Sequence, residues 1–141
     1  MDVESRVYLS RTVLPFDVVT LQQLADRSKI ANSRAGVTGF LTHRDGSFVQ
    51  YLEGTPTALD NLLVKIVADR RHEVIRLERL GRGPRRFVDW GMEVLDPLWM
   101  PTASAHDTLQ ELLGIAWSDS ARMSLLGEVR RSVERIATEY V

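Results

Sequence analysis

Three polar side chains in the first half of the chain occupy positions where the surrounding pattern predicts buried residues. Tyr8 lies in the β-rich run 6–10, Asn32 ends the inward stripe of an expected helix, and Gln50 alternates with large apolar residues in an expected strand. A phenol can release an electron and a proton together when an acceptor adjoins it. An amide can reverse a hydrogen bond by exchanging its donor and acceptor ends. Structural roles stay open, because a buried Tyr often only needs a partner and Asn32 could cap its helix.

Standard catalytic and metal-binding patterns are not found in the sequence. His43, His72 and His106 are scattered without paired ligand spacing, and no Gly-rich phosphate loop or nucleophile elbow occurs. The absence of cysteine excludes disulfides, thiolate nucleophiles and Cys-ligated zinc. The charged run 69–72 is typical of a solvated helix end. We therefore expect no metal site, and hydrolysis is a weak hypothesis.

Length and composition favour one compact globular domain. The chain has 141 residues, 44% of them hydrophobic, and its 18 basic and 19 acidic side chains give a net charge of -1. This balance lacks the broad basic field needed for non-specific nucleic-acid binding. No apolar run approaches the roughly 18 residues of a membrane span, and the acidic start is unlike a signal peptide. We expect a cytoplasmic protein without nucleic-acid or membrane partners.

Periodicity predicts the order β-α-β-β-α-β-β. The expected elements are a strand at 6–10, a helix from Asp17 to Asn32, strands at 37–43 and 47–53, a helix opened by Gly54-Thr55-Pro56, and strands at 73–80 and 87–95. Thr20 and Gln23 have the spacing of a capping box, and Gly36 ends the first helix. Asp45-Gly46 predicts a hairpin.

Alternation in three of these elements assigns side chains to faces. In the 47–53 strand, Phe48, Gln50 and Leu52 face one way. The second helix has the buried stripe Leu59, Leu62, Leu63 and Ile66, and the last strand is expected to turn Val88, Trp90, Met92 and Val94 to one face.

The element order predicts a ferredoxin-like α+β sandwich, with a mixed five-stranded sheet and two helices on one face. The remaining sequence is suited to covering the other face. A linker from Asp96 to about His106 precedes a short helix after Asp107 and a longer helix with an apolar stripe. That stripe consists of Leu126, Val129, Val133, Ile136 and Tyr140. It can pack on the sheet, on a partner subunit, or on both.

Several sequence blocks resemble the BLUF family of flavin-dependent blue-light sensors, in order and at family spacing over about residues 5–95. They are Arg6-Val7-Tyr8-Leu9-Ser10, Ser28-Lys29-Ile30-Ala31-Asn32, Gly36-Val37-Thr38-Gly39, Phe48-Val49-Gln50-Tyr51-Leu52-Glu53-Gly54, Asp69-Arg70-Arg71-His72 and Arg86-Phe87-Val88-Asp89-Trp90-Gly91-Met92. The resemblance implies a non-covalent flavin between the two helices, usually FAD and sometimes FMN.

The resemblance also implies roles for individual residues. Tyr8 would be the photochemical electron donor, and Gln50 the amide that bridges it to flavin N5 and O4. Asn32 would hold the O4 and N3 edge of the ring. The remaining implied flavin-binding residues are Ser28, Lys65, Asp69, Arg71 and His72. Ala31 departs from the family, whose members often carry Asn or His there.

Signalling residues follow from the same resemblance: Ser10, and Trp90 and Met92 on the family's switchable strand beside Gln50. The expected organisation is a flavin-binding domain at 1–96, with a linker and helical extension at 97–141 that covers the sheet or contacts a partner. We expect a photosensory protein without substrate turnover, acting through an unknown partner protein and assembling as a homodimer or larger homo-oligomer. Two alternatives are a flavin-binding protein without light signalling and, with less support, a small acylphosphatase-like hydrolase.

Overall fold

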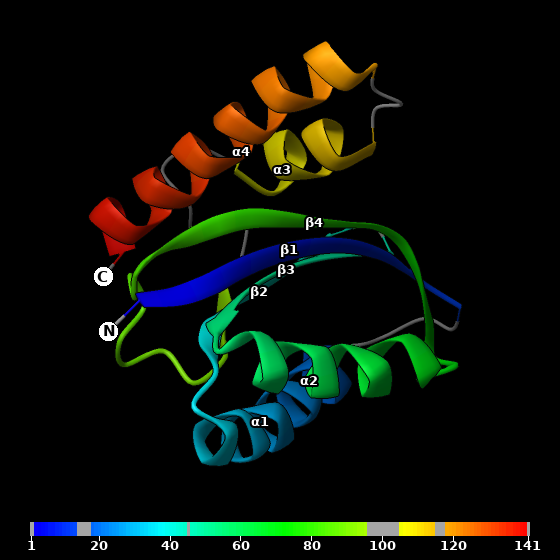
Figure 1. Ribbon diagram of the computed structural model, residues 1–141. Coiled ribbons are helices and arrows are strands. Elements are labelled where there is room, and N and C mark those ends of the chain that lie inside the picture. The colour runs from blue at the N-terminus through cyan, green and yellow to red at the C-terminus, as the bar shows by residue number, and fades with distance from the viewer. Residues whose placement is uncertain (1, 14–17, 45, 96–104, 115–117, 141) are drawn as a thin grey trace.

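The computed structural model describes residues 2–13, 18–44, 46–95, 105–114 and 118–140 (Figure 1). Its elements are β1 (Asp2–Thr12), α1 (Val18–Ala35), β2 (Thr38–Arg44), β3 (Ser47–Gly54), α2 (Pro56–Ala68), β4 (His72–Pro84), β5 (Glu93–Leu95), α3 (Ala105–Gly114) and α4 (Asp119–Tyr140). The strands form one mixed sheet in the order β4-β1-β3-β2-β5, in which only the β2–β5 pairing is parallel. The predicted ferredoxin-like α+β fold is confirmed.

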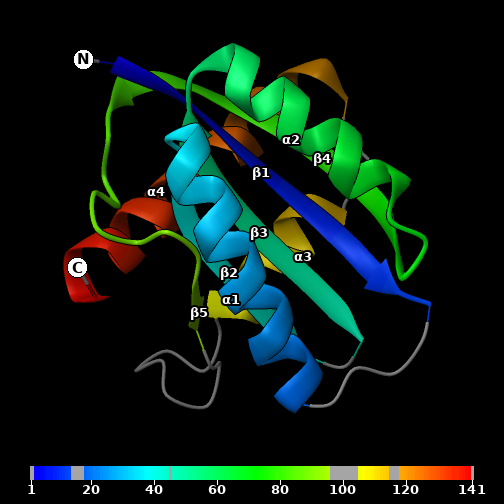
Figure 2. The same ribbon diagram turned by 90° about the horizontal axis from the view of Figure 1, so that it is seen from below.

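The sheet is the middle layer of three. Helices α1 and α2 lie across one face, and α3 and α4 cover the other (Figures 1 and 2). Because side chains alternate along a strand, neighbouring residues of β1 and β3 enter different cores. One core holds Val7 and Tyr51 with residues of α3 and α4, whereas the other holds Tyr8 and Leu52 with residues of α2. The predicted alternation in β3 is therefore confirmed.

Local signals explain the end of α1 and the start of α2. Gly36, with a φ of 71°, follows α1, as a left-handed residue after a helix commonly does. Thr55 caps α2 by accepting a hydrogen bond from the Ala58 amide at 3.2 Å. The capping-box prediction for Thr20 is wrong, since α1 already begins at Val18. Asp17 and Asp45 lie outside the described residues.

The predicted last strand is the main error in the fold. Only Glu93–Leu95 pairs with β2, and residues 85–92 form turns and bends. Trp90 donates its amide to the Phe87 carbonyl at 3.2 Å and accepts from the Gly39 amide at 2.8 Å. Val88 is 62% exposed. The apolar residues of this segment therefore enter two different cores or solvent, and do not share one strand face.

The C-terminal helices pack on the sheet. Leu109 and Leu113 of α3 and Val129, Val133 and Ile136 of α4 are buried in one cluster with residues of β1 and β3. Helix α3 begins at Ala105, slightly earlier than expected, while most of the predicted linker and the side chain of Tyr140 lie outside the described part of the chain. Within the described residues, no helix combines the length and apolar character needed to cross a membrane.

Candidate functional site

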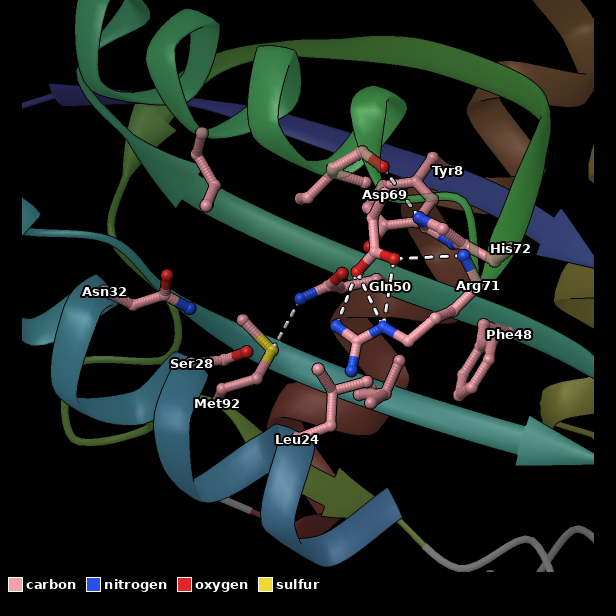
Figure 3. Close-up of a pocket in the computed structure, with 13 residues that line it drawn as sticks. Tyr8, Leu24, Ser28, Asn32, Phe48, Gln50, Asp69, Arg71, His72 and Met92 are labelled. Atoms are coloured by element: carbon pink, nitrogen blue, oxygen red, sulfur yellow. Dashed lines mark hydrogen bonds and ion pairs between the residues drawn. The ribbon is translucent and has the colours of Figure 1, made fainter. Parts of the chain in front are cut away.

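A cavity lies between α1, α2 and the sheet (Figure 3). The space between the lining residues, counting its open mouth, is about 600 Å³. It is lined by Tyr8, Leu24, Ser28, Asn32, Leu41, Phe48, Gln50, Leu62, Ile66, Asp69, Arg71, His72 and Met92. The α1 residues in this set are four positions apart and so share one helix face. The cavity thus has apolar walls with a few polar groups at its edges.

Tyr8 and Gln50 are directly opposite each other in the antiparallel β1–β3 pair. Both are buried, at 4% and 7% exposure, and both line the cavity. Burial raises the pKa of Tyr8 far above the ordinary value for a phenol, and the nearby Asp69 carboxylate raises it further. Tyr8 therefore keeps its hydroxyl proton at physiological pH.

Two side-chain amides hold the segment that leads into β5. Gln50 donates from Nε2 to the Met92 Sδ at 3.0 Å, a contact visible in Figure 3. Asn32 donates from Nδ2 to the Gly91 carbonyl at 3.3 Å. These bonds connect residues of the cavity to residues 91 and 92. The Asn32 bond reaches the backbone of Gly91, and the Gln50 bond reaches the side chain of Met92.

Charged groups gather where α2 passes into β4. The Arg71 guanidinium contacts the Asp69 carboxylate from two nitrogens, with the shortest distance 2.5 Å. This hydrogen bonding holds the pKa of Asp69 at about 2. His72 places Nε2 at 2.7 Å from the Ile66 carbonyl. The cavity mouth therefore carries a guanidinium that an anionic ligand group could also recruit.

Comparison with known families decides the identity of this fold and cavity. Residues 3–93 match the family described as BLUF, sensors of blue-light using FAD. The chain belongs to the BLUF family. It is a blue-light sensor that uses a flavin.

Two curated relatives and one solved structure extend the match. The chain is 36% identical over 127 residues to photoactivated adenylate cyclase subunit beta of Euglena gracilis, covering 85% of this chain and 14% of that protein. It is 40% identical over 93 residues to the subunit beta of Euglena longa, covering 62% and 10%. The chain thus spans only a small part of these relatives. The dark-state structure of BlrB, a BLUF protein, has a TM-score of 0.69 at 30% identity and covers 97% of this chain and 96% of BlrB.

The cavity fits a flavin by the chemistry of its lining. The apolar side chains of Leu24, Leu41 and Phe48 suit the faces of a flat aromatic ring. The amides of Asn32 and Gln50 offer the donors and acceptors that the polar edge of such a ring requires. Among the described residues, no group of three or more metal-ligating side chains is assembled. The apolar and amide groups of the lining suit an organic cofactor.

Most of the residues expected at the flavin site from the sequence lie together in this cavity. Those that line it are Tyr8, Ser28, Asn32, Gln50, Asp69, Arg71, His72 and Met92. Lys65 does not line it, since its side chain is exposed on α2. Leu41 also lines the cavity, and the sequence pattern does not predict it there. The pattern assigns Phe48 only to a strand face, and Leu62 and Ile66 only to the buried stripe of their helix. Phe48 shares a strand face with Gln50, and this pattern could have indicated that Phe48 lines the same cavity.

The two other residues expected from the sequence to take part in signalling lie away from the cavity. Trp90 packs on the opposite face of the sheet, with its ring centroid 5.1 Å from that of Phe87. Ser10 is completely buried in β1, and its Oγ has no hydrogen-bond partner within the described structure. The expectation that Trp90 and Met92 share one face is therefore wrong, because the turn at residues 87–90 sends them to opposite sides.

Proposed function

We propose that Tyr8 is the electron donor of this BLUF sensor and that Gln50 is the side chain whose hydrogen bonds change on illumination. The observation that carries the proposal is the placement of Tyr8 opposite Gln50, with Gln50 Nε2 bonded to Met92 Sδ. A bound flavin supplies a light-excited electron acceptor at this site. The other steps belong to the protein.

The protein steps follow from the chemistry of a phenol and an amide. In the dark Tyr8 is a neutral phenol, because burial holds its pKa high. Loss of an electron makes its Oη–H strongly acidic, so the proton leaves toward the Gln50 amide. Rotation or tautomerisation of Gln50 then reverses the hydrogen-bond polarity around it. The bond from Gln50 Nε2 to Met92 Sδ breaks in this step.

The signal leaves through the segment that joins the two faces of the sheet. Met92 lies in the cavity, whereas Trp90, two positions earlier, packs with the core that α3 and α4 cover. We propose that residues 1–96 bind flavin and that residues 97–141 present the output to a partner protein. Since Val129, Val133 and Ile136 are buried on the sheet of their own chain, a homo-oligomer would use other residues of α4.

The cofactor we propose is FAD, with FMN as a second candidate. The family description names FAD, and a structure of BlrP1 from Klebsiella pneumoniae was solved with FMN. Ser28, Asn32, Gln50, Asp69, Arg71 and His72 would hold it. Lys65 would contact it only if its side chain turned toward the cavity mouth.

The test is the visible absorption spectrum of the purified chain, recorded in the dark, after blue light, and during dark recovery. We expect a flavin spectrum that shifts slightly to the red and returns. Tyr8→Phe should keep the flavin and lose the shift. A bound flavin that only bleaches or stays unchanged would favour the light-inert flavoprotein. A colourless chain that refuses added flavin would overturn the proposal.

A further inference from the structure

A buried carboxylate, Glu53, is left without a role by the photochemistry. It is 0% exposed and lies on the sheet face covered by α3 and α4, three register positions from the cavity residue Tyr8 along the β1–β3 pair and on the other side of the sheet. Burying such a group is costly unless it is fully hydrogen-bonded. An apolar side chain would pack beside Tyr51 and Phe87 at lower cost. The bonds made by Glu53 should therefore explain its presence.

Both carboxylate oxygens of Glu53 accept hydrogen bonds, and half of these bonds come from the backbone that precedes the signalling residues. Oε2 accepts from the Arg86 amide at 3.1 Å, and Oε1 accepts from the Phe87 amide at 2.5 Å. The other two donors are the Thr38 and Tyr51 hydroxyls, each at 3.1 Å. An acceptor-only group suits four donors. The carboxylate thus ties residues 86 and 87 to β2 and β3.

The far end of the same stretch is held differently. Residues 86–92 are fixed at their start by Glu53, while Gly91 and Met92 are held by the cavity amides Asn32 and Gln50. The bonds made by Glu53 do not involve the cavity. The bonds to Gly91 and Met92 come from the side chains of Asn32 and Gln50, which would contact the flavin. Arg86 also reaches α4, because its Nη2 lies 2.7 Å from the Glu134 carboxylate.

We propose that Glu53 is a positioning residue that keeps residues 86–87 fixed during signalling, so that release of Met92 by Gln50 moves Trp90 about a stationary point. The inference rests on the proposed function. If residues 86–87 stay in place, a displacement of Met92 at the other end of the segment rotates Trp90, which lies between them. The Trp90 carbonyl also accepts a bond from the Gly39 amide of β2, which allows a rotation at Trp90 and limits its translation. Without Glu53, the start of the segment would loosen, and a change at Met92 would no longer turn Trp90 about a fixed residue.

The first test uses the unaltered full chain with its flavin bound, and follows amide hydrogen exchange in the dark and under blue light. We expect light to speed exchange at residues 90–92 and to leave the Arg86 and Phe87 amides unchanged. Equal acceleration at 86–87, with a normal absorption shift, would overturn the role of Glu53 alone. A chain with no absorption shift would overturn the proposed function, and this inference with it.

The second test compares two variants in the dark. Glu53→Gln keeps the side-chain shape but replaces one acceptor oxygen with a donor, so the backbone amide of either Arg86 or Phe87 loses its partner. Exchange at Arg86 or Phe87 should accelerate by about tenfold or more, as expected for loss of a buried bond to a charged group. Tyr51→Phe is the matched control, because it removes a donor to the same carboxylate and leaves the bonds from the Arg86 and Phe87 amides in place. Equal exchange in both variants would contradict the inference.

Discussion

Trp90 and Met92 are separated by one residue and lie on opposite faces of the sheet. Trp90 packs against Phe87 beneath α3 and α4, whereas Met92 accepts a hydrogen bond from Gln50 inside the cavity. The segment between them crosses the sheet beside β2, where the Gly39 amide donates to the Trp90 carbonyl. The cavity and the sheet face covered by α3 and α4 are thereby connected by a very short length of backbone.

Gln50→Glu should keep the flavin and abolish the normal red shift. A carboxylate has no N–H to donate to Met92 Sδ and no amide to reverse. The measurement is the light-minus-dark absorption spectrum. Gln23→Glu, the same change at an exposed position of α1, is the matched control and should shift normally. A normal shift in the Gln50 variant would refute the assigned role.

Arg71→Ala should weaken binding of FMN by about tenfold or more while changing the affinity for riboflavin little. The guanidinium lies at the cavity mouth, and a bond between charged groups contributes about 1.5–3 kcal/mol. Titration of flavin-free protein with each compound provides the measurement. Arg70→Ala, at the exposed neighbour outside the cavity lining, serves as the control. An equal loss for both compounds would show that Arg71 does not bind phosphate.

Acid should weaken the fold partly through Asp69. Hydrogen bonding to Arg71 lowers the pKa of Asp69 from 3.8 to about 2 in the folded protein. The unfolded chain therefore takes up the proton first as pH falls, so this stabilisation is complete above about pH 4 and is lost as pH falls through about 2. The stability difference between wild type and Asp69→Asn, from denaturant unfolding, should shrink over that window. In an Arg71→Gln background the variation with pH should become smaller, because the backbone amide of residue 71 and the charge of His72 still lower the pKa of Asp69. A variation as large as in the wild-type background would exclude the Arg71 side chain as the cause.

Leu113→Ala should lower the free energy of unfolding by about 2–5 kcal/mol, because this fully buried side chain packs α3 on the sheet. Met123→Ala removes an apolar side chain of α4 that is 72% exposed, and its effect should stay within about 0.5 kcal/mol. Urea unfolding of both variants measures the contrast. Similar values would mean that α3 does not cover the sheet in solution.

Elements with strong local signals were predictable from the sequence. The hairpin of β2 and β3 has a two-residue turn signal, and α2 has a capping threonine followed by an apolar stripe. Gln50 is recognisable because an amide between apolar residues on one strand face is unusual. These features depend on neighbours in the sequence, and so they can be recognised without the fold.

The segment before β5 could not be predicted in this way. Its apolar residues alternate like those of a strand, but its path is set by the buried Glu53 and by the Gly39 amide, both distant in sequence. The exposure of Lys65 is likewise decided by how α2 rotates on the sheet. A periodic pattern records which residues are apolar and does not record which of two cores receives them.

The register that pairs Tyr8 with Gln50 limits where insertions and deletions can occur in related sequences. Because β1 and β3 send successive residues to opposite faces, one residue inserted within β3 would exchange the residues of the cavity wall with those of the core beneath α3 and α4. Insertions in the turn before Ser47 leave that alternation untouched. Related sequences should accordingly differ in length at residues 44–46 and keep residues 47–54 free of insertions and deletions.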